Sequence, residues 1–373
     1  MNTIRPEVNN KIFSWAIARK GLSASDVVSV YPKFIEWQNG TAHATVKQLK
    51  DFSKRYYFPF GYFFLDSVPE NAKPAIPFFR CADEYNTAED INVNETVEIL
   101  QERQEWLSDY FKENNADKNP VIGIYKNEKD MTIILQGICG YLELEDDLNL
   151  KLKTPEKTLA FLRDKFEERN IIATFNSVVN NNAHRAIPVK LCRGFCLVDD
   201  YVPFIFVNSA DSKKAQIFTM LHELVHIFIS FTAGFGDCGA EKLPDSRESL
   251  CDKIAAEILV PKNILLKYKA SKSNAELSDY FKASEIVILR RKLDCGLISK
   301  SQFFAEYNNL PPYKKIGRSG GNFYATAEQR INPKFLRCLN NAIHDRSITP
   351  MEAYHLAGLK GDTFTRLAAG GNK

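Results

Sequence analysis

Two histidines four residues apart, with a glutamate between them, are the residues of this chain whose types and spacing point most directly to chemistry. His222 and His226 bracket Glu223 in the stretch FTMLHELVHIFIS, residues 218–230. In a helix the two imidazoles lie one turn apart on the same face and can bind one metal ion, while Glu223 projects from an adjacent face. Two histidine ligands and a carboxylate that takes a proton from water are typical of zinc-dependent hydrolysis. The alternative is a buried helix whose histidines bond to carbonyls.

A catalytic zinc site needs a third protein ligand and an open fourth position. The stretch ESLCDKIAAEILVP, residues 248–261, is predicted to be a helix and offers Glu248 and Glu257, with Asp252 between them. Glu248 lies in the first turn, from which a side chain can reach a neighbouring helix, so the spacing favours Glu248 over Glu257. The alternative for each is a solvent-exposed charge.

Arg193 stands at the start of a predicted strand near the HExxH helix. A cation there could polarise a scissile carbonyl or hold a substrate carboxylate. The alternative is an ion pair with Asp199 or Asp200. The predicted strands at 195–198 and 203–207 could also offer an edge to which a substrate peptide adds as an extra strand.

The elements that must position these residues indicate an α+β fold. A long amphipathic helix is predicted at 88–113. Strand–turn–strand patterns are predicted at 120–136 and 187–208, and further helices at 154–170, 212–230, 246–260, 275–292 and 299–308. The pattern as a whole predicts a small sheet beside an active-site helix, followed by a helical C-terminal region.

Residues 1–65 read as a bundle of short helices whose second and third members sit close together, as in a helix-turn-helix. This segment holds nine Lys and Arg against four Asp and Glu, whereas the whole chain is only +3. A basic face could contact a phosphate backbone. The candidate DNA-binding residues are Lys33, Lys47, Lys50, Lys54 and Arg55.

Composition places the chain among ordinary globular proteins, with 45% hydrophobic and 25% charged residues in a length of 373. Eight cysteines without a C-x-x-C pair, and a polar start without a signal peptide, lead us to expect reduced thiols and a cytoplasmic location. No stretch approaches the ~20 apolar residues of a membrane span, so no membrane partner is expected.

Four segments follow from these patterns. They are a helix-turn-helix-like domain at 1–66, a linker and long helix at 67–118, a metallopeptidase domain at 119–310, and a C-terminal helical tail at 311–373.

The motifs together resemble the ImmA/IrrE family of bacterial zinc metallopeptidases. The resemblance rests on RGFCLVDDYVPFIFVN, FTMLHELVHIF and ESLCDKIAAEILVP in family order and spacing, and more weakly on FIEWQNG and IPFFR in the front. It implies a zincin-like α+β core, Zn²⁺ as cofactor, His222, His226 and Glu248 as ligands, and Glu223 as general base. Asp252 stands where the family more commonly has Asn, and we expect no effect of this on metal binding.

The resemblance also implies a partner protein as substrate, commonly a repressor or other regulator encoded nearby. The expected function is therefore a zinc-dependent endopeptidase coupled to a helix-turn-helix module. The alternative is a DNA-binding regulator or antitoxin-like protein that uses the zincin fold as a sensing or structural platform.

Overall fold

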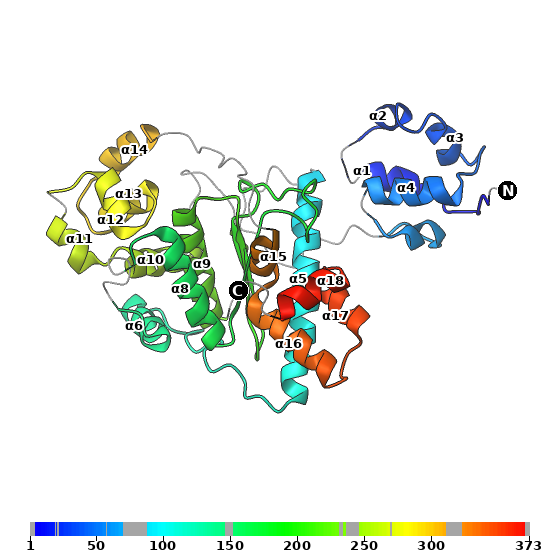
Figure 1. Cartoon of the computed structure of the whole chain (residues 1–373). Helices are drawn as coiled ribbons and strands as arrows, with labels where there is room; N and C mark the ends of the chain where they lie inside the picture. Colours follow the sequence, from blue (N-terminus) through cyan, green and yellow to red (C-terminus); the bar gives the residue numbers. More distant parts are fainter. Residues whose placement is uncertain are drawn as a thin grey trace. The chain divides into compact units, whose positions relative to one another are not determined.

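A computed structural model defines the fold in two compact units, residues 1–75 with 82–94, and residues 76–81 with 95–373 (Figure 1). The structure describes residues 4–18, 20, 22–56, 58–69, 88–145, 152–230, 234–235, 246–268, 271–310 and 323–369.

The first unit is built around an aromatic core. Phe13 lies at its centre, with ring contacts to Phe34, Trp37, Phe52 and Phe63 at centroid distances of 5.0 to 6.1 Å. Helices this short are marginal alone, so burial of these rings holds them. The elements are α1 (Lys11–Ala18), α2 (Ala24–Val28), α3 (Phe34–Gln38), α4 (Val46–Tyr56), the 3₁₀ helix η1 (Phe60–Phe64) and the start of α5 (Ala88–Glu113).

The second unit is mostly helical, with one small sheet. Its strands are β1 (Ile172–Asn176), β2 (Gly194–Leu197), β3 (Phe204–Asn208) and β4 (Gly234–Phe235). Its helices, besides the rest of α5, are α6 (Met131–Leu142), α8 (Pro155–Glu168), α9 (Lys213–Phe228), α10 (Ser246–Leu259), α11 (Lys262–Tyr268), α12 (Asn274–Phe281), α13 (Glu285–Asp294), α14 (Lys300–Asn308), α15 (Phe323–Ile331), α16 (Pro333–His344), α17 (Pro350–Ala357) and α18 (Gly361–Ala368). The α+β prediction is confirmed.

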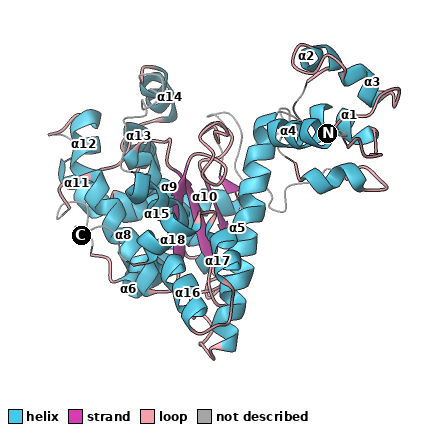
Figure 2. Ribbon diagram, turned by 45° about the vertical axis from the view of Figure 1, so that its right-hand side comes forward, coloured by secondary structure: helices cyan, strands magenta, loops and turns pink. Residues whose placement is uncertain are grey.

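The sheet has the order β1-β3-β2-β4 and lies between helices (Figure 2). β1 runs parallel to β3, and β2 runs antiparallel to both β3 and β4. Ile205 and Val207 of β3 belong to the core shared with α9, whereas Phe204 of the same strand packs against Phe335 of α16. Alternate side chains therefore face opposite layers, and both faces of the sheet are covered.

The strand–turn–strand prediction for 120–136 is wrong. Residues 120–127 form turns and α6 begins at Met131, with Asp130 capping it by accepting a hydrogen bond from the Thr132 amide at 2.8 Å. The buried residues Ile134 and Ile138 are four apart, which is helical spacing. Strand β1 (Ile172–Asn176) was not predicted from the sequence.

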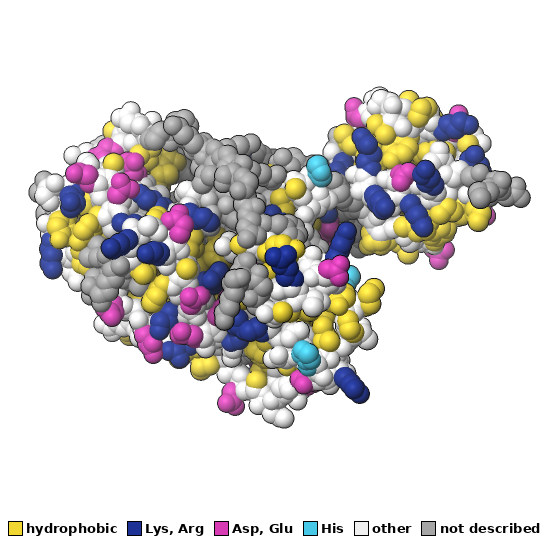
Figure 3. Space-filling view, in the orientation of Figure 1, with side chains coloured by type: hydrophobic (Ala, Val, Ile, Leu, Met, Phe, Trp, Pro, Cys, Tyr) yellow, Lys and Arg dark blue, Asp and Glu magenta, His cyan; other side chains and the backbone are white. Residues whose placement is uncertain are grey.

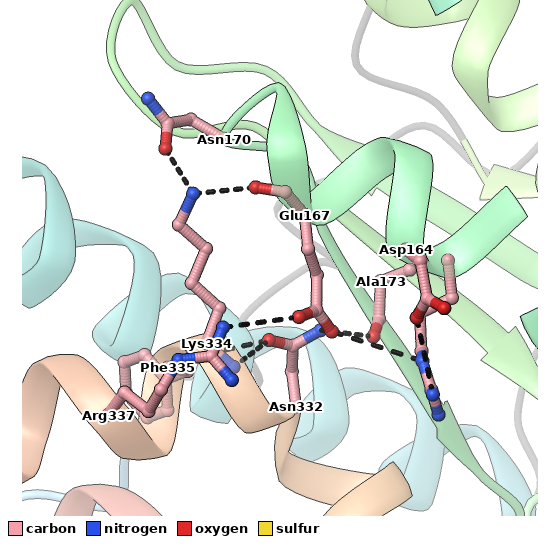
Figure 4. A network of polar contacts seen from close by, with 9 residues as sticks. Asp164, Glu167, Asn170, Ala173, Asn332, Lys334, Phe335 and Arg337 are labelled. Atoms are coloured by element: carbon pink, nitrogen blue, oxygen red, sulfur yellow. Dashed lines mark hydrogen bonds and ion pairs between the residues drawn. The ribbon is translucent and has the colours of Figure 1, made fainter. Parts of the chain in front are cut away.

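Helices α15 and α16 dock on α8 and the edge strand β1 through a polar network (Figure 4). Asn332 donates through Nδ2 to Glu167 Oε1 at 3.1 Å and to the Ala173 carbonyl at 3.0 Å, and its Oδ1 accepts from two amides at the start of α16. Lys334 donates to the carbonyl of Glu167, and Arg337 pairs with the Glu167 carboxylate. The C-terminal helices therefore belong to the second unit.

No helix of the described residues is both long and apolar enough to cross a bilayer.

We expect Asn332→Ala to lower the free energy of unfolding of the second unit by about 2–4 kcal/mol. The change removes a helix cap and leaves the buried Ala173 carbonyl without its donor. Urea unfolding followed by the fluorescence of Trp106, in a background with Trp15 and Trp37 replaced by Phe, measures this unit separately.

Asn341→Ala, at an exposed position of the same helix, is the matched control and should change the free energy by less than about 0.5 kcal/mol. Equal effects of the two substitutions would show that the Asn332 contacts do not hold α16 in place.

Candidate metal centre

Helix α9 carries the HExxH motif through the middle of the second unit. Ser212 caps its start by accepting a hydrogen bond from the Ala215 amide. Every residue from Thr219 to Phe228 is buried, because α9 packs between the sheet, α8 and α10. His222 and His226 are therefore held on a rigid element away from bulk water.

The structure brings His222, His226 and Glu248 together. Nε2 of His222 lies 3.0 Å from Nε2 of His226, and the two carboxylate oxygens of Glu248 lie 3.2 Å from these nitrogens, one oxygen from each. All three side chains are buried. Among the described residues, these three side chains form a cluster whose ligand atoms lie close enough together to hold one metal ion.

The spacing of these donor atoms fits a tetrahedral metal ion. Ligands about 2.0–2.1 Å from zinc at tetrahedral angles lie roughly 3.3 Å from one another. The separation of 3.0 Å between the two nitrogens and that of 3.2 Å from His222 Nε2 to Glu248 Oε2 approach two edges of such a tetrahedron, while the other oxygen of Glu248 lies 3.2 Å from His226 Nε2. Two imidazole nitrogens this close cannot both present a lone pair without a proton or a cation between them, so the donor set fits a bound cation.

The charges within this group are strongly coupled. Burial opposes protonation of His222, but Asp252 and Glu248 outweigh it and raise the pKa of His222 to about 10. Burial lowers the pKa of His226. Burial opposes ionisation of Glu248, yet the two histidines bring its pKa down to about 2. Metal binding at such a group is coupled to the release of protons from its ligands.

Glu223 lies beside the ligand group and is fully buried. Burial raises the pKa of this carboxyl to about 8, against the opposing effect of His222. Neither carboxylate oxygen accepts a hydrogen bond of regular geometry from the described residues. The Cys196 thiol acts against burial and lowers the pKa of Glu223. Glu223 is therefore available to exchange a proton.

Gly194 of β2 allows the sheet to approach this part of α9. A Cβ atom on Gly194 would lie 2.4 Å from Cγ2 of Thr219, 2.7 Å from the carbonyl oxygen of Phe206 and 3.6 Å from Cγ of Glu223. Any larger residue would push β2 away from the carboxylate. Sequence reasoning missed Gly194, because its role depends on a contact between two elements.

The other predicted site residues lie elsewhere. Glu257 forms an ion pair with Arg291 and accepts a hydrogen bond from the Lys262 amide, so it is not in the ligand group. Arg193 lies 3.6 Å from Asp211, not beside Asp199 or Asp200 as the alternative expected. Its catalytic role stays a prediction.

The expectation of a free edge at 195–198 and 203–207 is wrong for the second strand. β3 lies in the interior of the sheet, between β1 and β2. β2 itself pairs with β4 through Gly194 and Phe195. The positions of β2 and β3 in the sheet depend on the order of the strands, which the local sequence does not reveal.

Asp252 is a second residue, besides Gly194, whose contact with the site was not predicted from the sequence. Its Oδ1 lies 2.9 Å from Nδ1 of His222, although we expected no consequence of Asp at this position. The signal that could have found it is its spacing four residues after Glu248, which puts both on one helix face.

Comparison with known families supports the ImmA/IrrE resemblance for the metal-site part of the chain. The family model Peptidase_M78, described as an IrrE N-terminal-like domain, matches residues 185–292. No curated protein and no solved structure matches the chain. The match contains both histidines, Glu223 and Glu248, and it suggests a metallopeptidase-type function. It does not extend to the first unit.

We expect the wild-type chain to bind about one zinc ion, and Glu248→Gln to weaken binding by more than about 100-fold, because one of three ligands loses its charge. Asp279→Asn is the control: it removes an exposed carboxylate that pairs with Lys214 and should bind zinc like the wild type. Competition with a chromophoric chelator measures both affinities. Unchanged affinity in Glu248→Gln would exclude Glu248 as a ligand.

Proposed function

We propose that this chain is a zinc-dependent endopeptidase that cleaves a partner protein. The observation that carries the proposal is the convergence of three buried ligand atoms next to a buried carboxylate that is not part of the ligand group. Three protein ligands leave a fourth position open, which hydrolysis needs and a closed structural zinc site lacks.

Zinc, when bound, would act as a Lewis acid that acidifies water and polarises a peptide carbonyl. His222, His226 and Glu248 would hold the ion. Glu223 would take the proton from the attacking water and return it to the leaving amine. Because Glu223 is buried, its carboxyl holds a proton more readily than an exposed one, which suits a group that must both accept and donate.

The proposed substrate is a protein, with a repressor or another regulator encoded nearby as the leading candidate. This part rests on the resemblance to the ImmA/IrrE family. Arg193 is a candidate for contact with a substrate carbonyl or carboxylate, because it lies one residue before Gly194 and is partly exposed.

Glu223→Gln should retain zinc and reduce cleavage of the neighbouring gene product by about 10²–10⁴-fold, the usual contribution of a general base. Purified substrate is incubated with each variant, with and without a chelator, and product is followed by mass spectrometry. Glu352→Gln, at an exposed position of α17, should cleave like the wild type. Cleavage at the wild-type rate by Glu223→Gln would refute the mechanism.

The second candidate function is a DNA-binding regulator, and the basic face of α4 favours it. Lys47, Lys50 and Lys54 recur at helical spacing and are exposed, and Arg55 and Lys33 are exposed near them in sequence. Figure 3 shows Lys and Arg side chains gathered on the visible face of the first unit, over α4. A helix-turn-helix arrangement of α2 and α3 is part of this proposal.

The exposed positions of α3 are poorly suited to reading base edges. Ile35 and Glu36 are exposed, and the amide of Gln38 is engaged as a donor to Ser14 Oγ at 2.8 Å. Bases are read by amides and guanidinium groups, whereas lysines mainly contact phosphates. We therefore propose that any binding to DNA is dominated by the backbone.

Replacement of Lys47, Lys50 and Lys54 by Gln should weaken binding to DNA from upstream of the gene and reduce the salt dependence by about 0.9 per lost phosphate contact. Gel-shift titrations at several salt concentrations measure this. Replacement of the exposed Lys262, Lys267 and Lys300 in the second unit is the control.

Equal loss in the control would contradict a site on α4. Specific operator binding that survives Glu223→Gln, with no cleavage of any neighbouring protein, would favour the regulator over the peptidase.

A further inference from the structure

One face of α10 supplies more than a ligand to the metal centre. Cys251 and Asp252 lie three and four residues after Glu248, so all three side chains reach the side of the helix that meets α9. Each contacts a histidine of α9: Glu248 at the Nε2 atoms, Cys251 and Asp252 at the opposite ring nitrogens.

Asp252 lies behind His222. Its Oδ1 is 2.9 Å from Nδ1 of His222, while Nε2 of the same ring faces His226 and Glu248. At this distance the carboxylate forms an ion pair with the ring when His222 is protonated. A carboxylate here favours a proton on Nδ1, which leaves the Nε2 lone pair for a metal and makes the imidazole a more basic ligand.

Cys251 lies behind His226 and differs in kind. Its Sγ is 3.6 Å from Nδ1 of His226. The thiol is fully buried within the apolar core. A neutral thiol is a weak hydrogen-bond partner. The structure thus places a carboxylate behind His222 and a thiol behind His226.

We propose that Asp252 is a positioning residue for the ligand His222 and that it, rather than Cys251, sets the metal affinity of the centre. Helix α10 then provides the third ligand and also the group that selects the tautomer of the first. This inference rests on the proposed metal centre, but not on the cleavage of any substrate.

The test is the zinc affinity of the full-length chain, measured by chelator competition without substrate. Asp252→Ala is expected to weaken binding by about 10–100-fold, as is usual for an outer-shell partner. Asp252→Asn keeps an oxygen acceptor and should restore part of this loss. Cys251→Ala is expected to bind zinc within about threefold of the wild type, since a thiol contributes little.

Two controls separate positioning from general damage. Asp279→Asn removes an exposed carboxylate that pairs with Lys214, with the same change in net charge, and should leave zinc affinity unchanged. Far-UV circular dichroism and size-exclusion elution of the metal-free variants should match those of the wild type, because the Asp252 side chain is 41% exposed and its removal leaves no closed cavity.

Affinity of Asp252→Ala within about threefold of the wild type, or a loss in Cys251→Ala as large as that in Asp252→Ala, would overturn the inference. The proposed function can fail separately: a wild-type chain that binds zinc tightly, shows this order of affinities and cleaves nothing would refute the peptidase and leave the role of Asp252 standing. A wild-type chain that binds no zinc would refute both.

Discussion

Two imidazoles and a carboxylate within 3.2 Å of one another inside an apolar core are the constraint on which the second unit depends. Burying such groups is unfavourable unless each is paired. Here His222, His226 and Glu248 satisfy one another across two helices, and a cation would complete the arrangement. The same burial strengthens every charge interaction in the group, because the interior screens charges less than water does.

The elements around this group keep it in register. α9 is packed on all sides, and the ion pair of Glu257 with Arg291 holds α10 against α13. Arg291 also donates to the carbonyl of Val260 at the end of α10, at 3.0 Å. Glu257, the other glutamate considered as a ligand, therefore stabilises the packing of α10. Glu248 instead contacts the two histidines.

None of the described residues of the first unit belongs to the ligand group. This unit has its own core, built mainly from aromatic side chains, and it exposes Lys47, Lys50, Lys54 and Arg55 on α4. The two proposed functions therefore place the essential activity in different units: the peptidase in the second unit and the DNA-binding regulator in the first.

Local patterns determined the parts of this protein that depend on one helix at a time. The spacing of His222 and His226 sufficed to predict a shared face, because helical periodicity alone fixes it. The helix 88–113 was predicted for the same reason. The pattern failed at Ile134 and Ile138, where a short apolar run fits a strand or a helix and packing against the core decides.

Only the tertiary structure decided how separate elements meet. The ligand choice between Glu248 and Glu257 depends on which face of α10 meets α9, and spacing favoured Glu248 without excluding Glu257. The roles of Gly194 and Asp252 depend on distances between β2 and α9 and between α10 and α9. Such distances arise from packing between residues remote in sequence, and no local propensity encodes them.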